Sequence, residues 1–74
     1  MTFEQLKEIM VNTLNLEEKD IKPEASLKDL GVDSIDAVEL IMSLEENYDI
    51  QIPDEDAAKL EKVSDIIEYI NKKH

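Results

Sequence analysis

Ser34 is the residue of this sequence with the clearest chemical potential, because it follows Asp33 at the start of a stretch with helical spacing. The first N–H groups of a helix lack partners within the helix, so a serine hydroxyl here can accept a hydrogen bond and cap the helix. The same hydroxyl can instead be exposed and receive a covalent group from another enzyme. The residues alone leave both roles open. Ser34 combines a helix start, neighbouring acids and an apolar stripe one turn further on. None of the other serines has this combination: Ser26, Ser43 and Ser64.

A self-contained catalytic or metal site is not expected. A serine nucleophile needs a positioned base, and the single histidine is the terminal residue His74. The chain has no cysteine and no glycine-rich phosphate loop. The acids Asp54, Glu55 and Asp56 lack the spacing and the internal glycine of a calcium loop. We therefore expect neither an enzyme nor a defined metal site.

The apolar spacing predicts an all-α fold, a small bundle of three longer helices and one short helix in a single domain over residues 1–74. Thr2 and Gln5 are placed to form a capping box at the first helix. No stretch alternates with the period of two that a half-buried strand requires, so we expect no sheet. The expected helices cover residues 2–14, 34–48 and 63–72, with a short helix that begins at the acids 54–56 and holds Ala57, Ala58 and Leu60.

A long connection, residues 15–30, separates the first two expected helices. It is polar at first and is broken by Pro23, which disfavours helical geometry at Lys22. Apolar residues recur where they can reach a core, so we expect the loop to be ordered: Ile21, Ala25, Leu27 and Leu30. Gly31 then marks a turn that leads into Asp33 and Ser34.

The expected helix 34–48 carries two apolar stripes. The wider one is typical of a core face and contains Ala37, Leu40, Ile41, Leu44 and Tyr48. The narrower one contains Ile35, Val38 and Met42, with Glu39, Glu45, Glu46 and Asp49 around it. A second stripe rimmed by carboxylates indicates a docking surface for another protein. The alternative is that Leu27 and Leu30 of the long loop cover this stripe.

The negative charge is concentrated in the middle of the chain. Of the formal net charge of −11, residues 29–58 contribute ten acids and no base, whereas the rest has nine acids and eight lysines. Such a field repels nucleic acid and anionic membranes and attracts basic protein surfaces, although a merely solubilising acidic surface is the alternative. No apolar run reaches the roughly 20 residues of a membrane span, and the first residues do not resemble a signal peptide. We expect a soluble cytoplasmic monomer.

The run Gly31–Leu40 resembles the phosphopantetheine attachment motif of acyl carrier proteins, and the resemblance extends over the whole chain. Segments 23–26, 44–48, 52–57 and 63–70 are similar to the loop before the motif, the end of the second helix, the third helix and the last helix of that family. The chain looks most like the carriers of type II fatty acid synthases. It departs from them at Ile35, where leucine is usual, and at Tyr48, where phenylalanine is common.

The resemblance implies that Ser34 carries 4′-phosphopantetheine, which a separate magnesium-dependent transferase takes from coenzyme A, with Asp33 helping to present the serine. The thiol of this arm would hold acyl groups as thioesters for enzymes of fatty acid biosynthesis that have basic docking surfaces. The family's docking face matches Ile35, Asp36, Val38, Glu39, Met42 and Glu45. The apolar interior that shelters the chain matches Leu44, Tyr48, Ile52, Ala57 and Leu60. A polyketide or aminoacyl carrier, or an unmodified acidic adaptor protein, are the alternatives.

Overall fold

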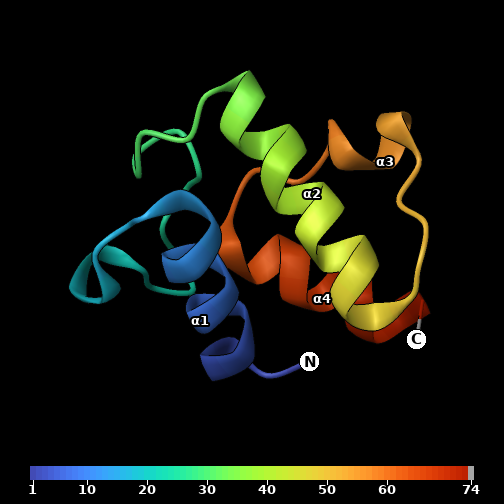
Figure 1. The fold of residues 1–74 in the computed structure, drawn as a ribbon, viewed down its shortest axis with the longest axis horizontal. Coiled ribbons are helices and arrows are strands. Elements are labelled where there is room, and N and C mark those ends of the chain that lie inside the picture. Colours follow the sequence, from blue (N-terminus) through green and yellow to red (C-terminus); the bar gives the residue numbers. More distant parts are fainter. Residues whose placement is uncertain (74) are drawn as a thin grey trace.

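The computed structural model describes residues 1–73 as a helical fold without a strand in that range (Figure 1). Its elements are α1 (Phe3–Leu14), the 3₁₀ helix η1 (Glu18–Asp20), α2 (Ser34–Tyr48), α3 (Asp54–Ala57) and α4 (Val63–Lys73). The predicted all-α class, with three longer helices and one short one, is thus confirmed. His74 lies outside the described residues. Among the described residues no helix is both long and apolar enough to span a bilayer.

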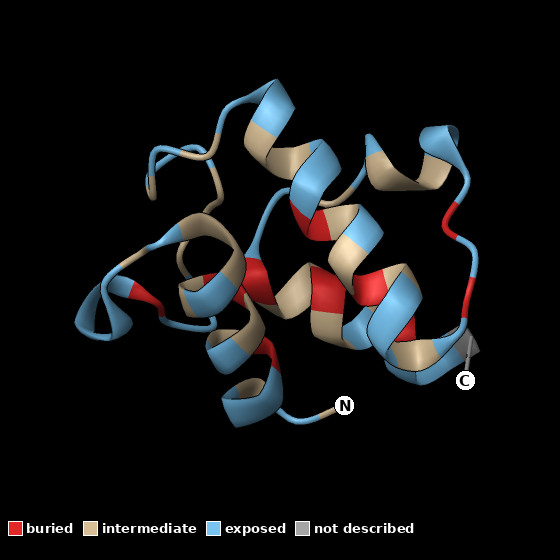
Figure 2. Cartoon of the chain, viewed as in Figure 1, coloured by how far each residue is buried: buried red, intermediate tan, exposed pale blue. Residues whose placement is uncertain are grey.

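The core is formed where α1, α2 and α4 meet (Figure 2). Each of these helices contributes its apolar face, and the connections add three isoleucines. The buried residues are Leu6, Met10, Ile21, Leu40, Leu44, Ile50, Ile52, Val63, Ile66 and Ile70, and no polar or charged residue within 1–72 is buried with them. The core is therefore held by removal of apolar surface from water.

Local signals define both ends of α1. The Thr2 hydroxyl accepts a 3.2 Å hydrogen bond from the Gln5 backbone N–H, and the Gln5 side chain accepts one of 2.9 Å from the Thr2 N–H. The predicted capping box is confirmed, and because Thr2 is the cap, the helix itself begins at Phe3. It ends at Leu14, and its C-cap Asn15 has a φ of 57°, a left-handed conformation that asparagine tolerates.

The long connection between α1 and α2 is ordered, as predicted. Ile21 is buried, and the backbone of this loop bonds to the segment before α4 through Leu27 N–H to Glu61 O at 2.8 Å and Val63 N–H to Ala25 O at 3.0 Å. The sequence analysis missed η1, which Lys7 of α1 anchors by an ion pair of 3.2 Å to Glu18. A single turn of three residues is too short to show any periodicity.

The short helix α3 ends earlier than predicted. It stops at Ala57, so Ala58 is its C-cap and Leu60 lies beyond it. The next backbone bonds, Lys59 N–H to Asp56 O and Leu60 N–H to Ala57 O, span three residues and not four. This tighter turn brings the chain round toward α4, and Leu60 packs against the core from outside the helix.

Candidate functional site

Asp33, and not Ser34, caps α2. The Asp33 carboxylate accepts a 2.8 Å hydrogen bond from the Asp36 backbone N–H, and Asp33 has the extended backbone of a cap residue. Ser34 is the first residue of the helix, and its hydroxyl makes no hydrogen bond to any residue in 1–73. The capping role that the sequence left open for Ser34 is therefore taken by its neighbour, because an aspartate one position earlier already satisfies the free N–H.

Ser34 is the only exposed serine of the four. The Ser26 hydroxyl accepts a 3.0 Å hydrogen bond from the Asp29 backbone N–H, and the Ser43 hydroxyl accepts one of 3.2 Å from the Thr13 hydroxyl. Ser64 is half-buried at the start of α4. Among the serines, only Ser34 combines an exposed side chain with a position at the entrance to a helix.

The turn before α2 depends on Gly31. Its φ of 81° is a conformation that side chains with a Cβ rarely adopt, although a Cβ there would meet no atom within 4 Å. Gly31 N–H donates to Lys28 O, and Val32 N–H donates to Leu27 O, each at 3.0 Å. The glycine is required by the direction of the backbone, which sets Asp33 and Ser34 at the start of the helix.

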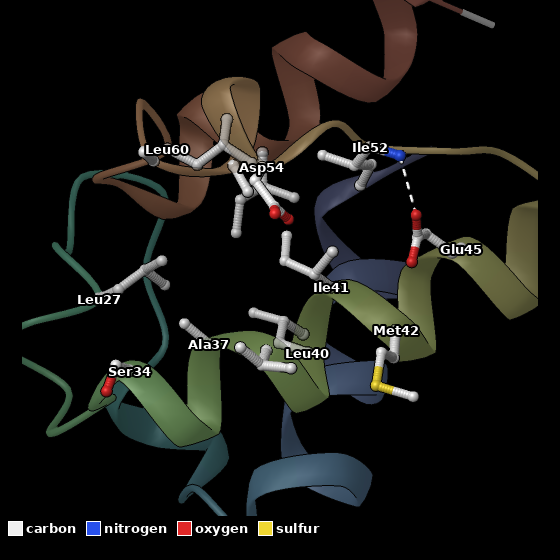
Figure 3. Close-up of a pocket in the computed structure, with 14 residues that line it drawn as sticks. Leu27, Ser34, Ala37, Leu40, Ile41, Met42, Glu45, Ile52, Asp54 and Leu60 are labelled. Atoms are coloured by element: carbon white, nitrogen blue, oxygen red, sulfur yellow. Dashed lines mark hydrogen bonds between the residues drawn. The ribbon is translucent and has the colours of Figure 1, made fainter.

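An apolar pocket of about 400 Å³ lies beside Ser34, between α2, α3 and α4 (Figure 3). In the close-up, Ser34 lies at the start of α2, and Ala37, Ile41 and Ile52 follow along the hollow. Mostly apolar side chains line it: Leu27, Ser34, Ala37, Val38, Leu40, Ile41, Met42, Glu45, Ile52, Asp54, Ala57, Ala58, Leu60 and Ile66. The hydroxyl of Ser34 therefore stands at the edge of a cavity suited to an apolar chain.

Three of the five residues predicted to form this interior line the pocket, namely Ile52, Ala57 and Leu60. Leu44 and Tyr48 do not line it. Leu44 is fully buried in the core, and Tyr48 lies at the other end of α2 beside Ile9 and Asn12 of α1. Position along α2 does not explain this difference, because Met42 and Glu45 from the same half of the helix do line the pocket.

The sequence analysis did not assign Leu27, Ala37, Leu40, Ile41 and Ile66 to the pocket. Helical periodicity had already placed Ala37, Leu40 and Ile41 on the inward face of α2, which was the available signal. Periodicity distinguishes the inward from the outward face but does not say which inward residues border a cavity. Leu27 and Ile66 come from distant segments, so only the packed structure brings them to this site.

The narrow stripe of α2 is exposed. Ile35, Val38 and Met42 are exposed by 69%, 58% and 54%, and they are the exposed large hydrophobic residues of the described chain. The alternative that Leu27 and Leu30 cover this stripe is wrong, since both pack against the core instead. We call these three residues the α2 ridge. Glu39 beside it is exposed, whereas Asp36 is half-buried.

Glu45 is directed away from the α2 ridge. Its carboxylate accepts a 2.9 Å hydrogen bond from the Ile52 backbone N–H, and the close-up shows this bond across the mouth of the pocket (Figure 3). Glu45 thus fastens the connection between α2 and α3 to α2. Its side chain has a structural task within this chain in addition to the docking task that the resemblance implies.

The acidic middle of the chain stays unneutralised in the fold. The three ion pairs within the described residues involve only Lys7 and Lys19, whose partners are Glu4, Glu17 and Glu18. None lies between residues 29 and 58. Among the described residues no three potential metal ligands are grouped closely enough to hold an ion. The carboxylates of residues 29–58 are therefore presented without ion-pair partners among the described residues.

Comparison with known proteins agrees with this geometry. The family model described as "Phosphopantetheine attachment site" matches residues 4–70. The structure is also similar to the crystal structure of an acyl carrier protein from Thermotoga maritima, with a TM-score of 0.84 and 33% sequence identity over 95% of this chain and 82% of that one. The chain therefore belongs to the phosphopantetheine-attachment family of acyl carrier proteins, for which phosphopantetheine is the covalently bound cofactor.

Proposed function

We propose that Ser34 is the attachment residue and that the chain carries acyl groups between enzymes of fatty acid biosynthesis. The observation that supports this most directly is that the neighbouring residues Asp33 and Ser34 have different roles. Asp33 caps the helix through its 2.8 Å bond to Asp36 N–H, so the exposed Ser34 hydroxyl is left available for covalent chemistry. The apolar pocket beside Ser34 fits the acyl chain that such an arm would bring.

Attachment joins the Ser34 oxygen to the phosphorus that bears the pantetheine. The bond between this phosphorus and the bridging oxygen of the coenzyme A pyrophosphate breaks, and adenosine 3′,5′-bisphosphate leaves. A serine hydroxyl needs a base to lose its proton, and no described residue is hydrogen-bonded to Ser34. The transferase must therefore supply the base and the metal, while this chain supplies a positioned, uncovered hydroxyl. The protein itself is then a carrier and not an enzyme.

The pocket favours a hydrocarbon chain over a charged cargo. The walls formed by Ala37, Ile41, Ile52 and Leu60 are apolar, and burying a charged group against them is costly. Asp54 and Glu45 are acidic members of the lining, and Glu45 is already bonded to Ile52 N–H. A growing fatty acyl thioester suits this composition, with synthesis in the cytoplasm by separate enzymes.

Intact mass tests the assignment of Ser34. The protein is incubated with coenzyme A, magnesium and a broad-specificity phosphopantetheinyl transferase. We expect a gain of one phosphopantetheine in the wild type and none in Ser34→Ala. Ser26→Ala serves as the matched control and should load normally. Failure of the wild type to load contradicts the proposal and favours the unmodified adaptor, whereas loading of Ser34→Ala contradicts the assignment of Ser34 and places the attachment at another residue.

The α2 ridge is proposed as the docking surface for the transferase and the synthase enzymes. Ile35, Val38 and Met42 expose apolar area next to carboxylates that no base offsets, which suits a partner with a basic rim around an apolar patch. Met42→Lys is expected to fold normally, because the side chain is 54% exposed. Its complex with a synthase enzyme, measured by calorimetry, should be weaker.

Asn12→Lys is the matched control for this surface, since Asn12 is exposed on α1 and belongs neither to the ridge nor to the lining of the apolar pocket. It introduces the same charge and should leave partner affinity closer to that of the wild type. Equal weakening by both lysines would indicate that net charge alone governs binding. Unfolding of Met42→Lys would show that the ridge is part of the core.

A further inference from the structure

A second hollow, of about 490 Å³, also borders Ser34. It lies between the segment Ser26–Lys28 of the long loop and residues Leu60 and Glu61 before α4. We call it the Lys28 groove. It shares Leu27, Ser34, Ala37 and Leu60 with the apolar pocket, so the two hollows meet at Ser34.

The Lys28 groove differs from the apolar pocket in its charge. Lys28 is its only base, and it is the last base before the acidic segment 29–58. Lys28 is exposed and forms no ion pair with any residue of 1–73. Two carboxylates also border the groove, but that of Asp33 is engaged with Asp36 N–H. The groove thus offers one free ammonium group close to the hydroxyl of Ser34.

The groove is held in place by backbone bonds on both sides. Leu27 N–H donates to Glu61 O at 2.8 Å, which fixes the loop against the segment before α4, and Val32 N–H donates to Leu27 O at 3.0 Å. The loop side of the groove is therefore fixed to the segment before α4. A phosphopantetheine arm attached to Ser34 would therefore meet a hollow that the unmodified fold already contains.

We propose that the unacylated phosphopantetheine arm lies in the Lys28 groove, with its phosphate beside the Lys28 ammonium group. This inference rests on the assignment of Ser34 under the proposed function. A phosphodiester at Ser34 places an anion next to Asp33, and Lys28 supplies the opposite charge within the same hollow. Leu27, Val32 and Leu60 give apolar contact for the paired methyl groups of the arm, and Glu61 can accept from its amide N–H groups. Lys28 is thus a positioning residue for the arm.

Nuclear magnetic resonance of matched apo and holo forms tests the inference. The forms are made for the wild type, Lys28→Gln and Lys22→Gln, and intact mass confirms the loading of each. Lys22 is an exposed lysine of the same loop that does not line the groove, so it is the matched control. We expect loading of the wild type to shift the amide resonances of Val32, Leu60 and Glu61. These shifts should shrink in Lys28→Gln, together with a change in the ³¹P resonance, and persist in Lys22→Gln.

The outcomes separate this inference from the proposed function. Absence of any mass gain overturns the assignment of Ser34 and this inference with it. Normal loading with shifts confined to the neighbours of Ser34, or directed to Ile52 and Ala58 in the apolar pocket, overturns the groove alone. Equal shifts in Lys28→Gln and the wild type overturn the role of Lys28. Loss of the groove shifts in Lys28→Gln with an unchanged apo spectrum supports it, because the fold is then intact.

Discussion

The Tyr69 hydroxyl donates a 2.7 Å hydrogen bond to Asp56 Oδ2 and thereby joins α4 to α3. This contact has particular weight because α3 is only four residues long, has no side-chain cap and contains no buried residue. The same short helix provides Asp54 and Ala57 to the wall of the apolar pocket. This bond therefore adds a polar contact to the packing of Ala57 against the core in holding that wall.

Tyr69→Phe should destabilise the protein by about 1 kcal/mol, the usual net value of one hydrogen bond. For a domain of this size that lowers the melting temperature by roughly 4–8 °C. Tyr48→Phe is the control, because the Tyr48 hydroxyl has no hydrogen bond to a residue of 1–73. Thermal denaturation followed by circular dichroism compares the two. Equal effects of both variants would show that the bond to Asp56 adds nothing.

The same bond predicts a loss of stability in strong alkali. The hydrogen bond to Asp56, with a smaller contribution from burial, raises the pKa of Tyr69 from 10.0 to about 12. The unfolded chain releases the Tyr69 proton near pH 10 and the folded chain near pH 12. The contribution of this bond to the free energy of unfolding is therefore complete below pH 10 and is lost as the pH rises through 12. Ultraviolet titration of Tyr48→Phe, in which Tyr69 is the single tyrosine, measures this pKa. Asp56→Asn in that background should lower it, and an unchanged midpoint would contradict the stated cause.

Substitutions at Asp33 and Ser34 should separate capping from attachment. Asp33→Ala removes the side chain that accepts from Asp36 N–H and should cost about 0.5–2 kcal/mol, whereas Asp33→Asn retains a capping oxygen and should cost less. Ser34→Ala removes an exposed hydroxyl without a partner and should change the free energy of unfolding by under about 0.5 kcal/mol. Urea denaturation measures all three. A cost for Ser34→Ala as large as that for Asp33→Ala would mean that the serine shares the capping role.

The acidic segment predicts that salt stabilises the fold. No ion pair within residues 29–58 offsets its ten acids, so their mutual repulsion opposes folding. Raising the ionic strength from about 0.01 M to 0.15 M shortens the screening length from about 30 Å to 8 Å and should raise the melting temperature. The double variant Glu39→Gln with Glu46→Gln, which neutralises two exposed acids, should show a smaller rise. A melting temperature that stays constant or falls with salt would show that repulsion is unimportant.

Much of the secondary structure follows from the order of residues along the chain. The bounds of α2 agree with the expected helix at both ends, and the capping box predicted α1 to within one residue. These signals are local: a cap lies within three residues of its partner, and an apolar face repeats every turn. Periodicity does not show where η1 forms or where α3 ends. The position of η1 depends on a contact between segments, that of Lys7 with Glu18, and α3 ends in a turn whose backbone bonds span three residues.

The sequence by itself determined the all-α fold, the second apolar stripe of Ile35, Val38 and Met42, and Ser34 as the residue of interest, whereas the exposure of that stripe was decided by the structure. Only the tertiary structure decided that Asp33 takes the capping bond, that Leu44 and Tyr48 lie outside the pocket, and that Leu27 and Ile66 border it. The reason is the range of the interactions involved. Helical pattern and charge are properties of neighbouring residues, whereas a cavity is a gap between side chains from distant segments, and its lining is known only once those segments have packed.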